Sequence, residues 1–427
     1  MPELKRSLGL LETTFYGVGL ILGAGIYAVI GKAAGIAGNT IWISFIVAAI
    51  IAAFSALSFC ELSTAFPRAA AEFVYVKKAF NKESLAFVIG WMVIFTGVFS
   101  SAAVALAFGG YFSELVLPLF HIPMVLGAAM LVIGMTLVNL YGIEQSAKAN
   151  IIFTIIEIFG LIFIIAIGIK FFGSVNYFEM PPSGITGIIT AAALVFFAYV
   201  GFEDIANVAE ETKNPEKILP KAILISITVT TILYILVAIS SISIIPWQIL
   251  GQSDAPLAIV AEKAIPGTSS LLSSIALFST GNTVLIMMIV ISRMMYGMAR
   301  DGVLPMFLSK ISSKRKTPWV AGFVTMALIL CFILLKDIRK VAEVSNFTIL
   351  IVFVAVNASL IYLRYSKPYI VRPFKVPLNI GRFPVLPFLG IVFSLFLMTY
   401  FSTFTIVLGS GIFVLGFVLY KMIKPKI

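Results

Sequence analysis

Apolar runs of about 20 residues recur along nearly the whole chain, and they limit its possible folds more than any other feature. An α-helix rises 1.5 Å per residue, so a run of about 20 residues crosses the ~30 Å hydrocarbon core of a bilayer. Only 11% of the 427 residues are charged, whereas soluble proteins carry about 25%. The sequence therefore predicts an all-α membrane protein that crosses the bilayer many times.

The apolar runs divide the chain into twelve expected transmembrane helices. No connection between them is long enough for a separate soluble domain, so we expect one transmembrane domain over residues 1–427. The expected spans cover residues 10–33, 40–66, 84–116, 124–141, 147–171, 185–209, 220–245, 269–299, 318–335, 342–363, 384–403 and 405–422.

Lysine and arginine are shared unequally between the two sides of this topology. With the N-terminus inside, 24 of the 30 basic residues fall in cytoplasmic segments, as the positive-inside rule requires. The six on the other side are Lys32, Lys170, Lys263, Lys336, Arg339 and Lys340. We therefore expect a cell-membrane protein with both termini in the cytoplasm. Basic loops that face anionic lipid account for the net charge of +11, so no nucleic-acid partner is expected.

Five glycines interrupt the first span, in the stretch "GVGLILGAGIYAVIG" at residues 17–31. Glycine inside a helix costs about 1 kcal/mol relative to alanine. Small residues in membrane helices commonly mediate close packing, which is one interpretation of Gly23, Ala24 and Gly25. The other is a discontinuous helix, of the kind that forms binding sites near the bilayer midplane in transporters.

The sixth span contains a second interruption, "FFAYVGFED" at residues 196–204, where Gly201 is followed by Glu203 and Asp204. An acidic residue at the centre of a membrane helix costs about 2.5–3.5 kcal/mol and normally faces a cavity or a partner. The alternative is that both acids lie near the end of the span. With five spans per repeat, spans 1 and 6 are equivalent. This predicts inverted repeats over about 10–171 and 185–363, with two extra helices over about 384–422.

Glu157 lies near the middle of the fifth span, about ten residues inside Lys148 and therefore roughly 15 Å deep. Two functional interpretations remain for this carboxyl group. It takes up a proton, because a buried charged carboxylate is unfavourable, or it coordinates Na⁺. A sodium ion needs several oxygen ligands, and Ser279, Thr280 and Thr283 in span 8 would provide some of them. A structural hydrogen bond to a neighbouring span is the third interpretation. We favour the proton.

Other chemistries lack the residues that they need. The single histidine, His121, is expected in a loop, and Cys60 and Cys331 lie in separate apolar segments. Metal or acid–base catalysis needs clustered ligands or paired carboxylates, and an ATP-driven pump needs a phosphate-binding loop. A channel needs charge rings or a filter repeat. We therefore expect neither an enzyme nor a channel, and no metal or cofactor.

Four motifs together resemble those of the amino acid–polyamine–organocation (APC) transporters, which share the 5+5 inverted-repeat fold of the bacterial leucine transporter. The motifs are "GVGLILGAGIY" (17–27), "SFCELSTAFPRAAAEFVYVKKAF" (58–80), "FFAYVGFEDIANVAEETKNPEKILPKAI" (196–223) and "SRMMYGMARDGVLP" (292–305). One departure is the pair Ala70 and Ala71, where the family usually has two glycines. The resemblance implies a secondary transporter that moves amino acids by alternating access.

The resemblance also implies roles for individual residues. Main-chain N–H groups at the break in span 1 would hold the substrate carboxylate, where a helix dipole favours an anion. Carbonyl groups in span 6 would accept hydrogen bonds from the α-ammonium, and the ring at position 197 would cap the substrate or pack in the core. The expected binding residues are Gly23, Ala24, Gly25, Ile26, Phe196, Phe197, Tyr199 and Gly201.

The resemblance leaves the energy source of transport open. Proton-coupled relatives have a lysine where Glu157 stands, and its ammonium occupies the place of a sodium ion in sodium-coupled members. A carboxylate cannot mimic a cation, so Glu157 and Glu203 are expected to couple transport to protons. The alternatives are a sodium-coupled amino acid symporter and an amino acid/polyamine exchanger.

Overall fold

The computed structural model describes residues 8–23, 25–67, 71–116, 122–141, 147–209, 212–300, 302–312 and 317–423. Within these ranges its helices and strands are those of a mainly helical protein with one two-stranded hairpin, joined by loops. Eight helical stretches of the described chain are long and apolar enough to cross a membrane, and three shorter apolar helices accompany them. The prediction of an all-α membrane protein is confirmed.

The helices follow the apolar runs closely. Those of the first half are α1 (Leu10–Leu22), α2 (Gly25–Ala37), α3 (Ile41–Ala65), α4 (Ala71–Phe80), α5 (Glu83–Val116), α6 (Met124–Tyr141) and α7 (Ala147–Gly168). Those of the second half are α8 (Gly184–Val195), α9 (Pro215–Ile244), α10 (Trp247–Gln252), α11 (Pro256–Ala264), α12 (Ser269–Arg300), α13 (Trp319–Ile333), α14 (Ile338–Ser366), α15 (Val385–Met398) and α16 (Thr403–Ile423). Most of the described residues in the expected ranges are helical, but residues 200–202 and 399–402 are not.

Several short elements were not expected. Two 3-10 helices, η3 (Phe196–Tyr199) and η4 (Glu203–Val208), follow α8. The helices α4, α10 and α11 lie in stretches expected to be connections, as does the antiparallel hairpin of β1 (Asn379–Ile380) and β2 (Phe383–Pro384).

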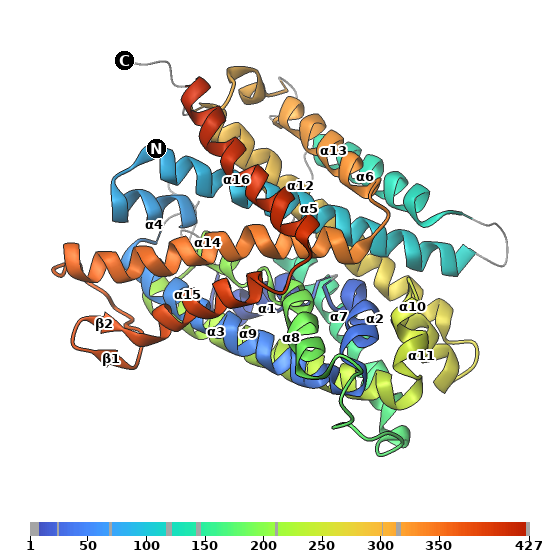
Figure 1. Ribbon diagram of the computed structural model, residues 1–427. Helices are drawn as coiled ribbons and strands as arrows, with labels where there is room; N and C mark the ends of the chain where they lie inside the picture. Colours follow the sequence, from blue (N-terminus) through green and yellow to red (C-terminus); the bar gives the residue numbers. More distant parts are fainter. Residues whose placement is uncertain are drawn as a thin grey trace.

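Helix α5 is the most enclosed of the long helices, and it packs against α12 and α14 (Figure 1). Small residues on α5 allow neighbouring backbones to approach closely: a Cβ on Gly110 would lie 2.3 Å from the carbonyl oxygen of Asp254. Peripheral helices instead expose apolar side chains, among them Phe159 on α7 and Val407 on α16. Such side chains are compatible with lipid, since hydrocarbon is as apolar as they are.

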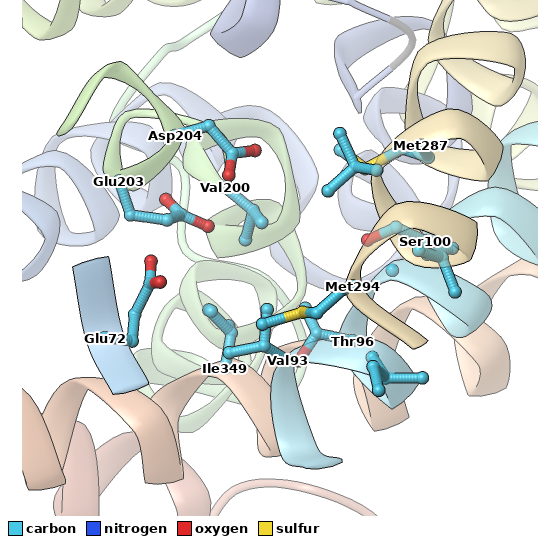
Figure 2. A pocket seen from close by; sticks show the side chains of 14 residues that line it. Glu72, Val93, Thr96, Ser100, Val200, Glu203, Asp204, Met287, Met294 and Ile349 are labelled. Atoms are coloured by element: carbon cyan, nitrogen blue, oxygen red, sulfur yellow. The ribbon is translucent and has the colours of Figure 1, made fainter. Parts of the chain in front are cut away.

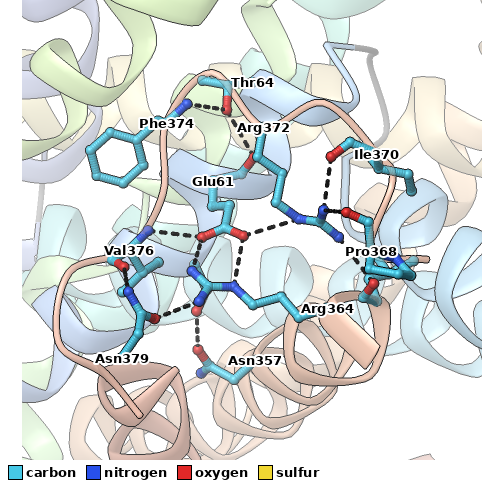
Figure 3. A network of polar contacts seen from close by, with 12 residues as sticks. Glu61, Thr64, Asn357, Arg364, Pro368, Ile370, Arg372, Phe374, Val376 and Asn379 are labelled. Carbon is cyan, nitrogen blue, oxygen red and sulfur yellow. Dashed lines mark hydrogen bonds and ion pairs between the residues drawn. The ribbon is translucent and has the colours of Figure 1, made fainter. Parts of the chain in front are cut away.

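A buried polar network fastens the segment after α14 to α3 (Figure 3). The Glu61 carboxylate, on α3, receives hydrogen bonds of 3.0 and 2.5 Å from the Arg364 guanidinium of α14. It also pairs with Arg372 at 3.3 Å and accepts the backbone N–H of Val376 at 2.8 Å. Because Glu61 is fully buried, its charge is balanced by these partners rather than by water.

Candidate functional site

The first interruption separates α1 from α2. Helix α1 ends at Leu22, Gly23 turns away with φ 18° and ψ −141°, and α2 begins at Gly25; Ala24 lies outside the described residues. The last carbonyl groups of a helix lack partners within it, and side chains of other helices provide them here. The Tyr234 hydroxyl donates to the Ile21 oxygen at 2.6 Å, and the Ser279 hydroxyl donates to the Gly23 oxygen at 2.8 Å.

The second interruption follows α8. After the 3-10 turn η3, Val200 is extended and Gly201 has φ +121°, a conformation that side chains other than hydrogen rarely allow. The chain then continues as η4, so the second half of this segment is a 3-10 helix. The Glu203 carboxylate accepts the backbone N–H of Gly201 at 2.9 Å.

The two interruptions touch each other through their main chains. A Cβ added to Gly25 would lie 2.7 Å from the Cα of Ala198, and one added to Gly201 would lie 2.9 Å from the carbonyl oxygen of Leu20. Contacting Cβ atoms essentially never come this close. The glycines therefore permit an antiparallel crossing of two segments that are far apart in the sequence.

The other predicted site residues lie in these same segments. Ile26 occupies the first turn of α2 and is fully buried. The Phe196 ring packs edge-on against Phe353 of α14, and Phe197 is 5% exposed. The Tyr199 hydroxyl donates to the Phe45 carbonyl of α3 at 3.1 Å. The side chain of Tyr199 is therefore bonded to α3, and only its main chain belongs to the turn.

Glu157 lies beside the first interruption, on α7. Its side chain is 2% exposed, and its Oε2 atom has no hydrogen-bond partner among the described residues. The carboxyl group faces the hydroxyl of Ser279, which bonds the Gly23 carbonyl. The Thr280 and Thr283 hydroxyls, also considered as cation ligands, donate to carbonyls of their own helix, α12.

A small cavity of about 30 Å³ lies next to the second interruption (Figure 2). Apolar side chains of α5 and α12, such as Val93 and Met294, form much of its wall. Glu72 of α4 points toward Glu203 and Asp204 across it. Burial, together with the nearby Asp204 charge, raises the pKa of Glu72 from 4.5 to about 8.

Two residues of this region, Glu72 and Tyr234, cannot be recognised as part of it from the amino-acid sequence. Glu72 lies in a quoted motif, but nothing in the spacing of that motif indicates that its side chain is buried. Tyr234 is one of 14 tyrosines and lies within a continuous apolar run. Only the packing of α9 against α1 brings its hydroxyl to the interruptions.

Comparison with known proteins covers nearly the whole chain. A family model described as amino acid permease matches residues 8–422. The branched-chain amino acid permease BcaP of Bacillus subtilis is 34% identical over 99% of this chain and 94% of its own length. The methylthioribose transporter of the same organism is 30% identical over 93% of this chain and 88% of its own. Vacuolar cationic amino acid transporter 4 of Arabidopsis thaliana is 28% identical over 86% of this chain and 64% of its own length.

Proposed function

This chain belongs to the amino acid permease family of the APC superfamily, and we propose that it is a secondary active transporter that carries amino acids across the cell membrane by alternating access. It is a transporter and not an enzyme. The contact between the two interrupted segments carries the proposal, because interrupted helices inside an apolar protein bring main-chain N–H and carbonyl groups together where a zwitterionic substrate could bond them. Gly25 and Ala198 mark the point where those groups meet.

We further propose the architecture in which such a site operates. Twelve spans would form one domain, with repeats over about 10–171 and 185–363 and extra helices over about 384–422. The interruptions support this arrangement, since each follows the start of one proposed repeat and they cross in antiparallel directions. The bias of lysine and arginine supports cytoplasmic termini.

The substrate would bind between the interruptions. The N–H groups of Gly25 and Ile26, at the positive end of α2, suit a carboxylate. Carbonyls from Phe196 to Tyr199 suit the α-ammonium, with the Phe197 ring as a cap and Gly201 as the turn. An α-amino acid carries both charged groups on one carbon, so the two subsites must adjoin, as Gly25 and Ala198 do.

Proton binding at Glu157 would drive this transport. The carboxyl group is buried, one of its oxygens lacks a partner within the described chain, and Ser279 links it to the Gly23 carbonyl. Glu203 is the second coupling candidate, and its bond to the Gly201 N–H would make the turn sensitive to its protonation. Sodium is the alternative ion. It needs several oxygens at once, and the hydroxyls of Thr280 and Thr283, which donate to carbonyls of their own helix, keep oxygen lone pairs for it.

Uptake by proteoliposomes tests the proposal. A panel of labelled amino acids and polyamines would be offered under an imposed proton gradient, an imposed sodium gradient, or with unlabelled substrate inside. We expect accumulation of at least one amino acid driven by protons. Accumulation driven by sodium alone would refute proton coupling, and exchange without either gradient would assign an exchanger. Transport of no amino acid under any condition would refute the function itself.

A further inference from the structure

The Tyr234 hydroxyl lies between two carbonyl oxygens that belong to different interrupted segments. Its oxygen is 2.6 Å from the oxygen of Ile21 and 2.9 Å from that of Ala198. A tyrosine hydroxyl has one proton to donate. At any moment, therefore, only one of the two carbonyls receives a full hydrogen bond.

Packing, rather than these two bonds, fixes the position of the hydroxyl. The Tyr234 ring is fully buried. It packs against Phe45 of α3 and against Tyr199, with ring centroids 5.5 Å apart in both cases. The hydroxyl cannot follow one carbonyl and abandon the other without moving these rings, so it stays shared between the two segments.

A buried carbonyl without a donor is unfavourable, so the carbonyl that lacks the tyrosine proton favours a second donor. The α-ammonium of an amino acid carries three N–H groups, as the lysine ammonium does. Ala198 lies in the stretch proposed to receive that ammonium, and its main chain contacts Gly25, where the proposed carboxylate subsite begins.

We infer that Tyr234 is a positioning residue whose hydroxyl substitutes for the substrate ammonium at the Ala198 carbonyl. In the empty site its proton is shared between Ile21 and Ala198. When substrate binds, the ammonium donates to Ala198 and the hydroxyl donates to Ile21 alone. This inference rests on the proposed function and adds to it the residue that holds the ammonium subsite ready.

Two replacements of Tyr234 separate this role from simple packing. Tyr234→Phe keeps the ring and removes the donor, so neither carbonyl has this partner. The substrate ammonium then supplies a donor to the Ala198 carbonyl. Replacement by 4-aminophenylalanine, through amber suppression, keeps the shape and offers two N–H donors. Both carbonyls are then satisfied before substrate arrives, and the ammonium must displace a complete hydrogen bond.

The measurement is the dissociation constant of the transported amino acid, together with the thermal shift it produces in purified protein. We expect the affinity and the shift to decrease in the order phenylalanine, tyrosine, 4-aminophenylalanine, with steps of about two- to tenfold in affinity, the size of one neutral hydrogen bond. A competitor that keeps the carboxylate but lacks the amino group should bind all three proteins equally. Tyr177→Phe is the control, since that hydroxyl bonds Gly173 and Ser243 away from the interruptions.

Equal affinities in the three proteins, or the reverse order, would overturn the inference. If the phenylalanine variant does not fold, the comparison of tyrosine with 4-aminophenylalanine still decides it, because weaker binding by an equally thermostable protein has no explanation in packing. Wild-type protein that neither binds nor transports any amino acid would refute the proposed function instead.

Discussion

The Glu203 carboxylate accepts a hydrogen bond of 2.9 Å from the backbone N–H of Gly201, two residues before it. A side chain thus provides the partner that a continuous helix would have offered to this N–H group. The acidic residue that looked costly inside an apolar span stabilises the turn that interrupts it, and the positive φ of Gly201 makes this turn possible.

Replacing Gly201 tests how much this turn depends on glycine. Gly201→Ala should lower stability by about 1–3 kcal/mol because of its backbone conformation, and further because the new Cβ would lie 2.9 Å from the Leu20 carbonyl. Thermal unfolding in detergent measures the loss. The control is Gly267→Ala. Gly267 also has a positive φ, but nothing lies within 4 Å of the Cβ that alanine would add. An equal loss in both variants would contradict the contact with Leu20.

Gly25 should tolerate no side chain. Gly25→Val places carbon atoms against the Ala198 main chain, which cannot give way without separating the two interruptions. We expect substrate binding to fall below detection, as measured by equilibrium binding of the labelled amino acid. Gly134→Ala on α6, where nothing lies within 4 Å of the added carbon, should leave binding unchanged. Retained affinity in the Gly25 variant would refute the proposed carboxylate subsite.

Glu157→Gln should uncouple transport from protons. The amide keeps the size of the side chain and cannot ionise, so a proton gradient should no longer drive accumulation, while exchange of labelled for unlabelled substrate continues. Uptake at several imposed gradients distinguishes the two activities. Glu216→Gln, on the exposed first turn of α9, should behave as wild type. Proton-driven accumulation by the Glu157 variant at the wild-type rate would exclude this residue as the coupling site.

The stability of the protein should depend on pH through Glu72. Its pKa is raised from 4.5 to about 8 in the folded state by burial and by the Asp204 charge, and Glu203 also lines the same cavity. Between these values the folded protein keeps a proton that the unfolded chain releases, so stability falls as pH rises, by at most about 1.4 kcal/mol per pH unit from this group.

Glu72→Gln should flatten this dependence between pH 5 and 8, as followed by the melting temperature at closely spaced pH values. Glu216→Gln should leave the slope of the wild type unchanged. A Glu72 variant whose melting temperature falls with pH as steeply as that of the wild type would show that another group is responsible.

Breaking the network around Glu61 should be far more damaging than breaking an exposed ion pair. Glu61→Gln leaves Arg364 and Arg372 without their counter-charge, and removal of one partner of a buried pair costs about 3–5 kcal/mol. Lys340→Ala removes a pair with Asp337 in which both side chains are exposed, worth about 0–1 kcal/mol. Thermal unfolding of the two variants measures the loss of stability in each. Equal losses would argue that burial of the Glu61 network does not matter.

The helices were predictable because hydrophobicity alone determines which segments suit a membrane. Helix α5, for example, begins one residue before the expected span and ends with it at Val116. Gly23 and Gly201 were recognisable as interruptions because glycine and acidic residues are unfavourable inside an apolar helix. Sequence periodicity says nothing of which helices meet, so the contact between the interruptions required the structure.

Other features depended on tertiary packing or on weaker local signals. Helices α10 and α11 are short and lie between apolar runs, although Pro256 at the start of α11 is a recognisable helix-start residue. Glu72 looks like an ordinary surface acid until α4 packs against α5 and α14. The importance of Tyr234 depends on where one oxygen atom lies, and an apolar run contains no information about that.

The crossing of the two interruptions, at Gly25 with Ala198 and at Gly201 with Leu20, is made largely by main-chain atoms. Side chains that do not bond these main-chain groups can therefore change without placing an atom in the contact. Under the proposed function, substitutions in the neighbouring walls would change which amino acid side chain fits, while the main-chain groups proposed to hold the carboxylate and the ammonium stay in place. A side chain at Gly25 or Gly201 would enter this contact directly.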